Sequence, residues 1–278
     1  MDNKSLAITA YKIRRHIIEA VYHAASGHPG GSLSIADILS VLYFDEMNVS
    51  PKNPKDPNRD RLVLSKGHCS PALYGALCER GFFPAEDIKT FRKIDSYLQG
   101  HPDMKSVPGV DMSTGSLGQG VCAANGMALA AKLDGKGYRV YAILGDGELE
   151  EGQVWEAAMF APHYQLDNVA IFIDYNGLQI DGDITKVMNP EPIDKKFEAF
   201  GWNVLTIDAH DYGQIKDAIQ TAKNTRGKPT AIIAKSTKGK GVSFMENAAG
   251  WHGKAPNEDE YKLAILELDN KIKELEAE

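Results

Sequence analysis

The chain has 278 residues, of which 43% are hydrophobic and 25% charged, and its formal net charge of −7 leaves no basic surface for nucleic acid or an anionic membrane. Its three cysteines form no CxxC pair, which argues against both a zinc site and a disulfide framework. Because the N-terminus also lacks an apolar signal segment, we expect a cytoplasmic protein without nucleic-acid or membrane partners.

The N-terminal part of the chain is predicted to be helical, with loops rich in Gly, Pro and Asp. Apolar residues recur at helical spacing from Ile8 to Val21, where the segment SGHPGGS interrupts the pattern. Ile35–Phe44 predicts a second helix, and a Pro-rich polar loop follows it. Arg61–Ser65 is typical of a short buried strand, and Ala72–Arg80 predicts the next helix.

After Gly120, strands and helices alternate along the chain. The predicted strands are Tyr138–Leu144, Asn168–Tyr175, Trp202–Ile207 and Thr230–Lys235. The predicted helices are Val121–Lys132, Gln153–Ala161, Asp194–Phe200, Tyr212–Lys223 and an amphipathic helix at Glu258–Glu278. Nearly continuous apolar strands separated by helices indicate an α/β fold, doubly wound, with a mostly parallel sheet and helices on both faces. Without a linker or a repeat, we expect one domain spanning residues 1–278.

A polar pair marks the predicted carboxyl edge of this sheet. Asp146 lies in a Gly-Asp-Gly turn directly after one strand, and Asn176 follows the next strand some thirty residues later. Ligands of open parallel sheets bind at this edge, and Gly145 and Gly147 allow the backbone to approach phosphate oxygens closely. Hard oxygen ligands in this arrangement suit Mg²⁺ that is also bound to a diphosphate. The alternative is a plain Asp-Gly turn and a loop cap; because both residues follow strands, we favour the metal.

This stretch resembles the thiamine-diphosphate (ThDP) motif, in which GDG is followed by Asn, and the chain from about Ala7 to Gly253 resembles the N-terminal, diphosphate-binding part of a transketolase. Seven motifs carry the resemblance in order: SGHPGGS (Ser26–Ser32), SKGHCSPALYG (Ser65–Gly75), GHP (Gly100–Pro102), TGSLGQG (Thr114–Gly120), GDGELEEG (Gly145–Gly152), YNGLQIDG (Tyr175–Gly182) and WHGKAPN (Trp251–Asn257). Deoxyxylulose-phosphate synthase and ketoacid dehydrogenase α-subunits share GDG and Asn, but the histidine motifs favour transketolase. The resemblance implies the ThDP-binding fold of the PP-type domain, with ThDP and Mg²⁺ as cofactors and Ca²⁺ or Mn²⁺ as alternative metals.

The resemblance also implies roles for the residues of the GDG–Asn region. Asp146, Asn176 and the backbone carbonyl of Leu178 resemble the metal ligands of the family. Gly147 resembles a residue that lies against the diphosphate, and His68 resembles one that contacts the same group. These five residues are therefore expected to hold the metal and the diphosphate end of the cofactor.

Two further motifs resemble family residues with other functions. Gly115 and Leu117 resemble residues that shape the bent cofactor, although Ser116 stands where the family usually has Pro. Glu151 and Glu156 resemble an acidic chain that links the two active sites of the assembled enzyme. Glu151 is accordingly predicted to be catalytic.

Three histidines resemble those that line the substrate channel of the family: His28, His101 and His252. The activity implied is reversible transfer of a two-carbon glycolaldehyde unit from a ketose phosphate to an aldose phosphate, as in the pentose phosphate pathway. Each half of that reaction needs proton transfer near neutral pH, where imidazole titrates. These histidines are therefore predicted to be catalytic.

Other polar groups have interpretations that do not involve catalysis. Four histidines are expected on a helix surface, at a helix end or in a turn: His16, His23, His163 and His210. The basic segment KSTKGKG (Lys235–Gly241) is interpreted either as a phosphate contact or as a solvated loop. Glu148 and Glu150 have the alternative of simple acids near a helix N-terminus. Cys69 beside His68 is not expected to be a nucleophile, because adjacent residues in a turn seldom face each other.

The resemblance also implies a partner. The family activates ThDP with a pyrimidine-binding domain, and a chain ending at Glu278 leaves no room for one. We expect a separately encoded C-terminal transketolase subunit that carries this domain, two chains of each kind in a heterotetramer, and sugar phosphates as substrates. Two alternatives stand: a related transketolase that acts on an unusual sugar phosphate, and a non-catalytic regulatory module with the ThDP fold.

Overall fold

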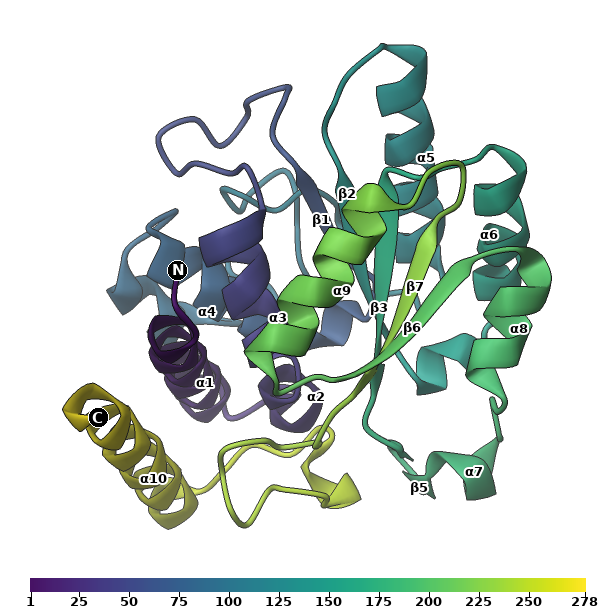
Figure 1. Cartoon of the computed structure of the whole chain (residues 1–278). Helices are drawn as coiled ribbons and strands as arrows, with labels where there is room; N and C mark the ends of the chain where they lie inside the picture. The colour runs from purple at the N-terminus through teal and green to yellow at the C-terminus, as the bar shows by residue number, and fades with distance from the viewer.

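The centre of the molecule is a sheet of five parallel strands in the order β1-β2-β3-β7-β6, seen in a computed structural model that describes residues 1–278 (Figure 1). These strands are β1 (Arg61–Leu64), β2 (Val140–Gly145), β3 (Val169–Tyr175), β6 (Asn203–Asp208) and β7 (Thr230–Lys235). A small antiparallel pair, β4 (Leu178–Gln179) and β5 (Gly182–Asp183), stands apart from the sheet. The predicted parallel sheet is confirmed, and each of its five strands lies where the sequence pattern placed it.

Helices cover both faces of the sheet, as Figure 1 shows. One face packs against α1 (Asn3–Ala24), α3 (Ala36–Val41), α4 (Ser70–Arg80) and α9 (Tyr212–Asn224). The other face packs against α5 (Gln119–Leu133), α6 (Gly152–His163) and α8 (Ile193–Phe200). The doubly wound arrangement expected from the sequence is therefore confirmed.

The strand sequences explain why both faces are covered. Along β2, Tyr141 and Ile143 join the core under α1 and α9, whereas Ala142 and Leu144 join the core under α5 and α6. Successive side chains of a strand point to opposite faces, so an uninterrupted apolar run needs an apolar layer on each side. The two apolar layers therefore explain why the strand sequences are apolar without interruption.

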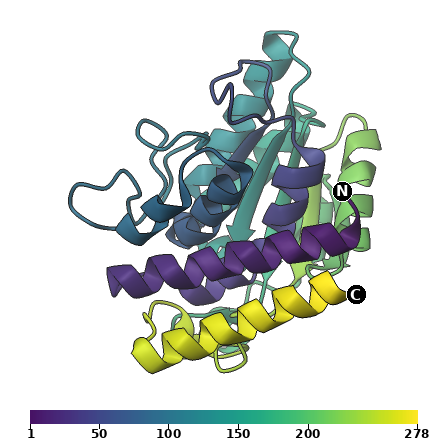
Figure 2. The ribbon, with the colours of Figure 1, turned by 90° about the vertical axis from the view of Figure 1, so that its left-hand side faces the viewer.

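The two terminal helices lie side by side at the edge of the molecule. Figure 2 shows α1 and α10 (Glu258–Ala277) running antiparallel, with both termini at the same end. Arg15 donates to Asp269 over 3.1 Å, and the rings of Tyr22 and Tyr261 stack with centroids 4.0 Å apart. A capping box of Asn257 and Glu260 begins α10, so the predicted amphipathic helix is confirmed as a packing element.

The expected interruption at SGHPGGS is shorter than the sequence suggested. Only residues 25–28 are non-helical, because Pro29 starts a second helix, α2 (Pro29–Leu33). Proline is favoured at a first helical position, where its fixed φ suits the helix and no backbone N–H is needed. A Cβ on Gly30 would lie 2.9 Å from the carbonyl of Trp251, so this helix packs closely against the WHGKAPN loop. His28 is thereby held immediately before a helix.

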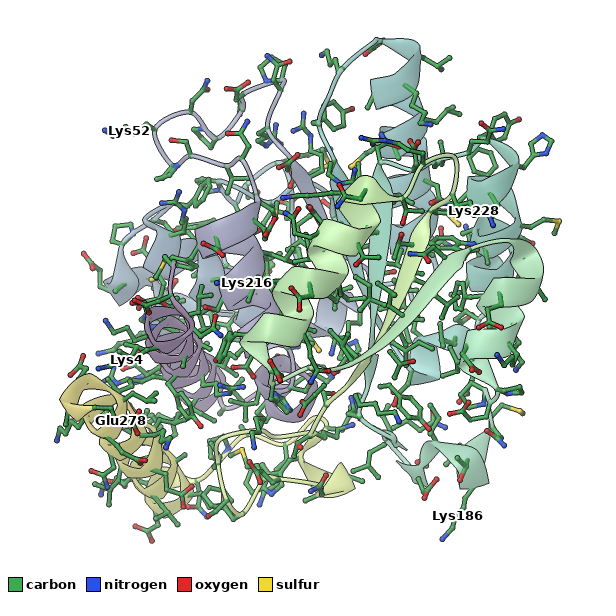
Figure 3. All side chains as sticks on the ribbon, viewed as in Figure 1. Lys4, Lys52, Lys186, Lys216, Lys228 and Glu278 are labelled. Atoms are coloured by element: carbon green, nitrogen blue, oxygen red, sulfur yellow. The ribbon has the colours of Figure 1, made fainter.

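The remaining short helix, α7 (Ile184–Val187), follows the β4–β5 pair. Charged side chains such as Lys52 and Lys186 lie at the periphery in Figure 3, and both are exposed. All three cysteines are free, in agreement with the predicted absence of a disulfide framework. None of the helices combines the length and the apolarity that crossing a membrane requires.

Candidate active site

A cavity of about 270 Å³ opens at the carboxyl edge of the sheet, where β1, β2, β3 and β7 end. Residues from six of the seven motifs line it: His28, His68, Gly115, Leu117, Asp146, Gly147, Asn176, Leu178 and His252. The third motif, GHP, lies at its rim, where His101 packs against Gly115. Loops that are distant in the sequence therefore meet at the sheet edge where a parallel α/β fold binds its ligands.

The three predicted metal ligands lie together on one side of this cavity. The carboxylate of Asp146 accepts the N–H of Gly177 over 2.7 Å and that of Gly147 over 2.9 Å. The side-chain oxygen of Asn176 accepts the N–H of Leu178 over 3.1 Å. The backbone turn after β3 thus brings a carboxylate, an amide oxygen and a carbonyl oxygen into one group.

This donor set fits a hard divalent cation beside a diphosphate. Its atoms are all oxygens, the ligands that Mg²⁺ and Ca²⁺ prefer. Burial, followed by the nearby charge of Asp174, raises the pKa of Asp146 to about 7, although the charge of Lys66 and two backbone hydrogen bonds act in the opposite direction. Two buried nitrogens that face the cavity, Nε2 of Gln179 and Nδ1 of His28, have no hydrogen-bond partner. A negatively charged ligand with a bound cation would satisfy these groups.

Three histidines form a second group in the same cavity. The ring centroids of His28, His68 and His252 lie between 5.1 and 5.4 Å apart. Burial, together with the neighbouring cations and imidazoles, lowers the pKa of His28 and His68 to about 4 and that of His252 to about 3. Imidazoles that titrate near neutral pH were expected from the sequence. The rings in this chain depart from that expectation because they are partly buried beside Lys66 and Lys238. A bound diphosphate would raise these pKa values through its negative charge.

His101 and Glu151 lie outside the cavity wall. The ring of His101 is exposed and packs against the loop of Gly115, whose added Cβ would lie 2.9 Å from its Cδ2. Burial and the charge of Arg92 lower the pKa of His101. Glu151 immediately precedes α6, and both it and Glu156 are exposed on the outside of the molecule. The structure therefore does not bring Glu151 to the other predicted site residues.

Several buried polar residues around the cavity were not predicted from the sequence. Lys238 in KSTKGKG is only 1% exposed, and its ammonium donates to the carbonyl of Leu178 over 2.9 Å and lies 3.1 Å from Nδ1 of His252. The solvated-loop interpretation of this residue is wrong. Since KSTKGKG directly follows β7, the rule that ligands bind at the carboxyl edge would have identified Lys238.

Glu148 is also buried, and it joins three loops of the site. Its carboxylate accepts the hydroxyl of Ser65 and the N–H groups of Gly118 (2.9 Å) and Gly145 (3.1 Å). Burial raises its pKa. The interpretation as a simple acid near a helix end is wrong, because this carboxylate links the ends of β1 and β2 to the loop that carries Leu117.

The histidines predicted to be structural lie outside the cavity. His210 contacts Asp37 over 2.7 Å and accepts the N–H of Thr237 over 2.9 Å, so it orders a loop as expected. His23 and His163 are exposed near helix ends. His16 differs from the prediction: it is 7% exposed and lies 2.7 Å from Glu79, so it is a buried residue between helices.

Comparison with known proteins agrees with this geometry. Residues 5–271 match the family described as "Transketolase, thiamine diphosphate binding domain". The chain is 48% identical to the 6-deoxy-6-sulfo-D-fructose transketolase subunit SqwG of Clostridium sp. (strain MSTE9), over 92% of this chain and 94% of that protein. It is 42% identical to an apulose-4-phosphate transketolase subunit of Phocaeicola vulgatus, over 100% and 99% of the two chains. The transketolase structure from Campylobacter jejuni superposes with a TM-score of 0.86 at 35% identity.

The chain therefore belongs to the transketolase family and contains its thiamine-diphosphate-binding domain. Two of its relatives, which it matches over nearly their whole length, are named as subunits of transketolases, and this supports a transferase that works with a partner subunit. The Campylobacter enzyme is longer, and this chain spans 48% of it. The family and the fold predicted from the sequence are confirmed.

Proposed function

We propose that this subunit, together with its C-terminal partner, catalyses the reversible transfer of a two-carbon glycolaldehyde unit from a ketose phosphate to an aldose phosphate. The observation that carries the proposal is one cavity lined both by the three residues with proposed oxygen ligands and by a cluster of three histidines. ThDP, when bound, supplies the carbon centre that stabilises the transferred carbanion. The protein binds and orients this cofactor and moves protons.

The residues on the metal side of the cavity, together with His68 from the histidine group, would hold the cofactor. Asp146, Asn176 and the carbonyl of Leu178 would bind Mg²⁺, with Ca²⁺ or Mn²⁺ as substitutes, and Gly147 and His68 would lie at the diphosphate. Lys238 adds a buried cation on the same side, where it would face the negative charge of the diphosphate. Gly115 and Leu117 would shape the cofactor from the opposite loop.

The histidines would exchange protons with the sugar. His28 and His252 line the cavity, and each would accept a proton from a sugar hydroxyl in one half of the reaction and return it in the other. In the cofactor-free chain their lowered pKa values keep both rings neutral at pH 7, which is the form that accepts a proton. His101 at the rim would contact the more distal part of the sugar.

The test is a two-carbon transfer assay with the chain co-purified with its partner, ThDP and Mg²⁺, using xylulose 5-phosphate and ribose 5-phosphate. Activity is expected only when both subunits are present, because the pyrimidine-binding domain is expected in the partner. Full activity of the isolated chain would overturn the split-enzyme proposal. Unchanged activity of the Asp146→Ala complex would overturn the catalytic proposal and support a regulatory module.

A second candidate substrate class is favoured by the relatives. One is named for 6-deoxy-6-sulfo-D-fructose and another for apulose 4-phosphate, neither of which is a sugar of the pentose phosphate pathway. We therefore include both sugars as donors in the same assay, each with glyceraldehyde 3-phosphate as acceptor. A kcat/KM for one of them more than about tenfold above that for xylulose 5-phosphate would place this enzyme outside the pentose phosphate pathway.

The assembly is proposed to be a heterotetramer of two chains of each kind, in the cytoplasm. A symmetric doubling of the two-chain unit would explain the exposed position of Glu151 and Glu156, which would then face a second active unit. The mass of the co-purified complex by light scattering tests this, since a simple heterodimer would have half the expected value.

A further inference from the structure

Behind the proposed metal site lies a buried carboxylate that the proposed function does not use. Asp174 is the penultimate residue of β3, is completely buried, and lies two residues before Asn176. Its Oδ2 accepts from Lys66 over 2.6 Å, from Ser34 over 2.8 Å and from the amide nitrogen of Asn176 over 2.9 Å. Its Oδ1 accepts from Ser236. A buried carboxylate with four donors is fully satisfied within this chain.

The contact with Asn176 determines how the amide of that residue is oriented. A carboxylate is only an acceptor, so it binds the amide through the nitrogen and leaves the oxygen on the other side. That oxygen accepts the N–H of Leu178 and lies at the cavity. If the amide of Asn176 were turned around, its oxygen would face the carboxylate oxygen of Asp174. Its NH₂ group would then point at the cation. The orientation that a metal ligand needs is therefore the one that Asp174 enforces.

Asp174 also contacts the second predicted ligand through its backbone. The N–H of Asp146 lies 3.3 Å from the carbonyl of Asp174, and the β2–β3 register pairs Asp174 with Gly145. One residue of β3 thus touches both residues whose side chains are proposed to bind the cation. This places the two ligands relative to each other as well as orienting one of them.

The buried lysine explains why Asp174 is not itself a ligand. The Lys66 ammonium is 2% exposed, binds Asp174, and is also held by the carbonyl of Gly31 over 2.8 Å. Lys66, Ser34 and Ser236 all donate to the Asp174 carboxylate, so its oxygens are occupied by donors of this chain. Because its oxygens are taken up by these donors, Asp174 is not free to bind a cation directly and acts on the site through the orientation of Asn176.

We propose that Asp174, compensated by Lys66, is a positioning residue that fixes the amide of Asn176 with its oxygen toward the bound cation. This inference rests on the proposed metal site, and it concerns residues to which that proposal gives no role. Partners that orient metal ligands in this way typically change metal affinity by about 10- to 100-fold when they are removed.

The test measures Mn²⁺ binding by the two-subunit complex in the presence of ThDP, using the electron paramagnetic resonance signal of free Mn²⁺. Asp174→Asn is expected to weaken Mn²⁺ binding by about 10- to 100-fold. Ser236→Ala removes another hydrogen bond to the same carboxylate without touching Asn176, and it is expected to stay within about twofold of the parent. An Asp174→Asn complex within about twofold of the parent would overturn the proposal.

A double-mutant cycle separates orientation from a general structural role. If Asp174 acts through Asn176, Asp174→Asn loses its effect when Asn176→Ala is already present. Retention of the full effect in that background would overturn the proposal. If the Asp174→Asn variant fails to fold, the double variant Lys66→Met/Asp174→Leu takes its place in the cycle. This double variant removes both buried charges together, so neither is left without a partner. A parent complex that binds no Mn²⁺ would instead overturn the metal site of the proposed function.

Discussion

The two sides of the cavity differ in how complete they are. On the metal side, both oxygens of Asp146 and both polar atoms of the Asn176 side chain have hydrogen-bond partners within the chain. On the histidine side, Nδ1 of His28 is buried without a partner and His101 is exposed, and beside Gly147 the Nε2 of Gln179 is also buried without a partner. Satisfied polar networks are rigid, whereas an unpaired buried nitrogen is costly unless a ligand reaches it. The chain therefore holds the proposed metal ligands Asp146 and Asn176 through its own hydrogen bonds, whereas the unpaired nitrogens of Gln179 and His28 are left for a ligand.

The largest effect is expected from Asp146→Ala on the metal side. Removal of a residue that only orients a metal ligand weakens metal binding by up to about 100-fold. Removal of a direct ligand should weaken Mn²⁺ binding by more than this, and two-carbon transfer should become undetectable. Titration with Mn²⁺ and the coupled assay measure this. Glu150→Ala is the matched control, because it removes an exposed acid from the same motif and should change neither quantity. Equal losses in both variants would contradict a specific site at Asp146.

The second prediction concerns the histidine side. His28→Ala should lower kcat by about 100-fold, the lower end of what a positioned acid–base group contributes, while Mn²⁺ and ThDP affinities stay near those of the parent. The reason is that His28 lines the cavity but has no hydrogen bond to the predicted metal ligands. Kinetics and cofactor titration on the same complex provide the measurement. A loss of cofactor binding as large as that of Asp146→Ala would remove the division between the two sides.

The predictions from sequence agree best with the structure where they concern the position of a single strand or helix. The pattern predicted β7 at Thr230–Lys235 and α8 near Asp194–Phe200 because continuous apolar strands and helical periodicity are local properties. The GDG–Asn pair was likewise predictable, since both residues directly follow strands. The metal ligands predicted by this rule and by resemblance line one cavity, and their binding of a metal stays a prediction.

The missed residues depend on packing between distant segments. Lys66 and Asp174 are far apart in the sequence, and their contact exists only because β1, β2 and β3 are neighbours in the sheet. His16 lies on a helix, but its burial follows from the packing of α1 against α4, where Glu79 lies. Such pairings need the three-dimensional arrangement of the strands and helices, which periodicity does not supply. Lys238 is the exception, because its place after β7 was visible.

The third prediction concerns the thermal stability of the metal-free chain, which a substitution of Asp146 is expected to increase. Because the folded-state pKa of Asp146 is raised to about 7 from an ordinary value of 3.8, its carboxylate opposes folding above pH 7. Asp146→Asn should therefore raise Tm by a few degrees at pH 8, and the gain should shrink as pH falls from about 7 toward 4, where the parent carboxyl becomes protonated. Thermal unfolding across this range tests the sign. A destabilised variant at pH 8 would show that the hydrogen bonds of Asp146 outweigh its buried charge.

The smallest effect on this chain is expected from Glu151→Gln. Glu151 is exposed and away from the cavity, so neither Mn²⁺ affinity nor the stability of the isolated chain should change. Its predicted role, communication between two active units, can appear only in the assembled enzyme, as a lower kcat or an altered dependence of rate on ThDP concentration. The measurement compares cofactor titrations of the parent and variant complexes at equal assembly, checked by light scattering. If kcat and the ThDP dependence are both unchanged, Glu151 has no part in catalysis, and the functional part of this chain is confined to the two sides of its cavity.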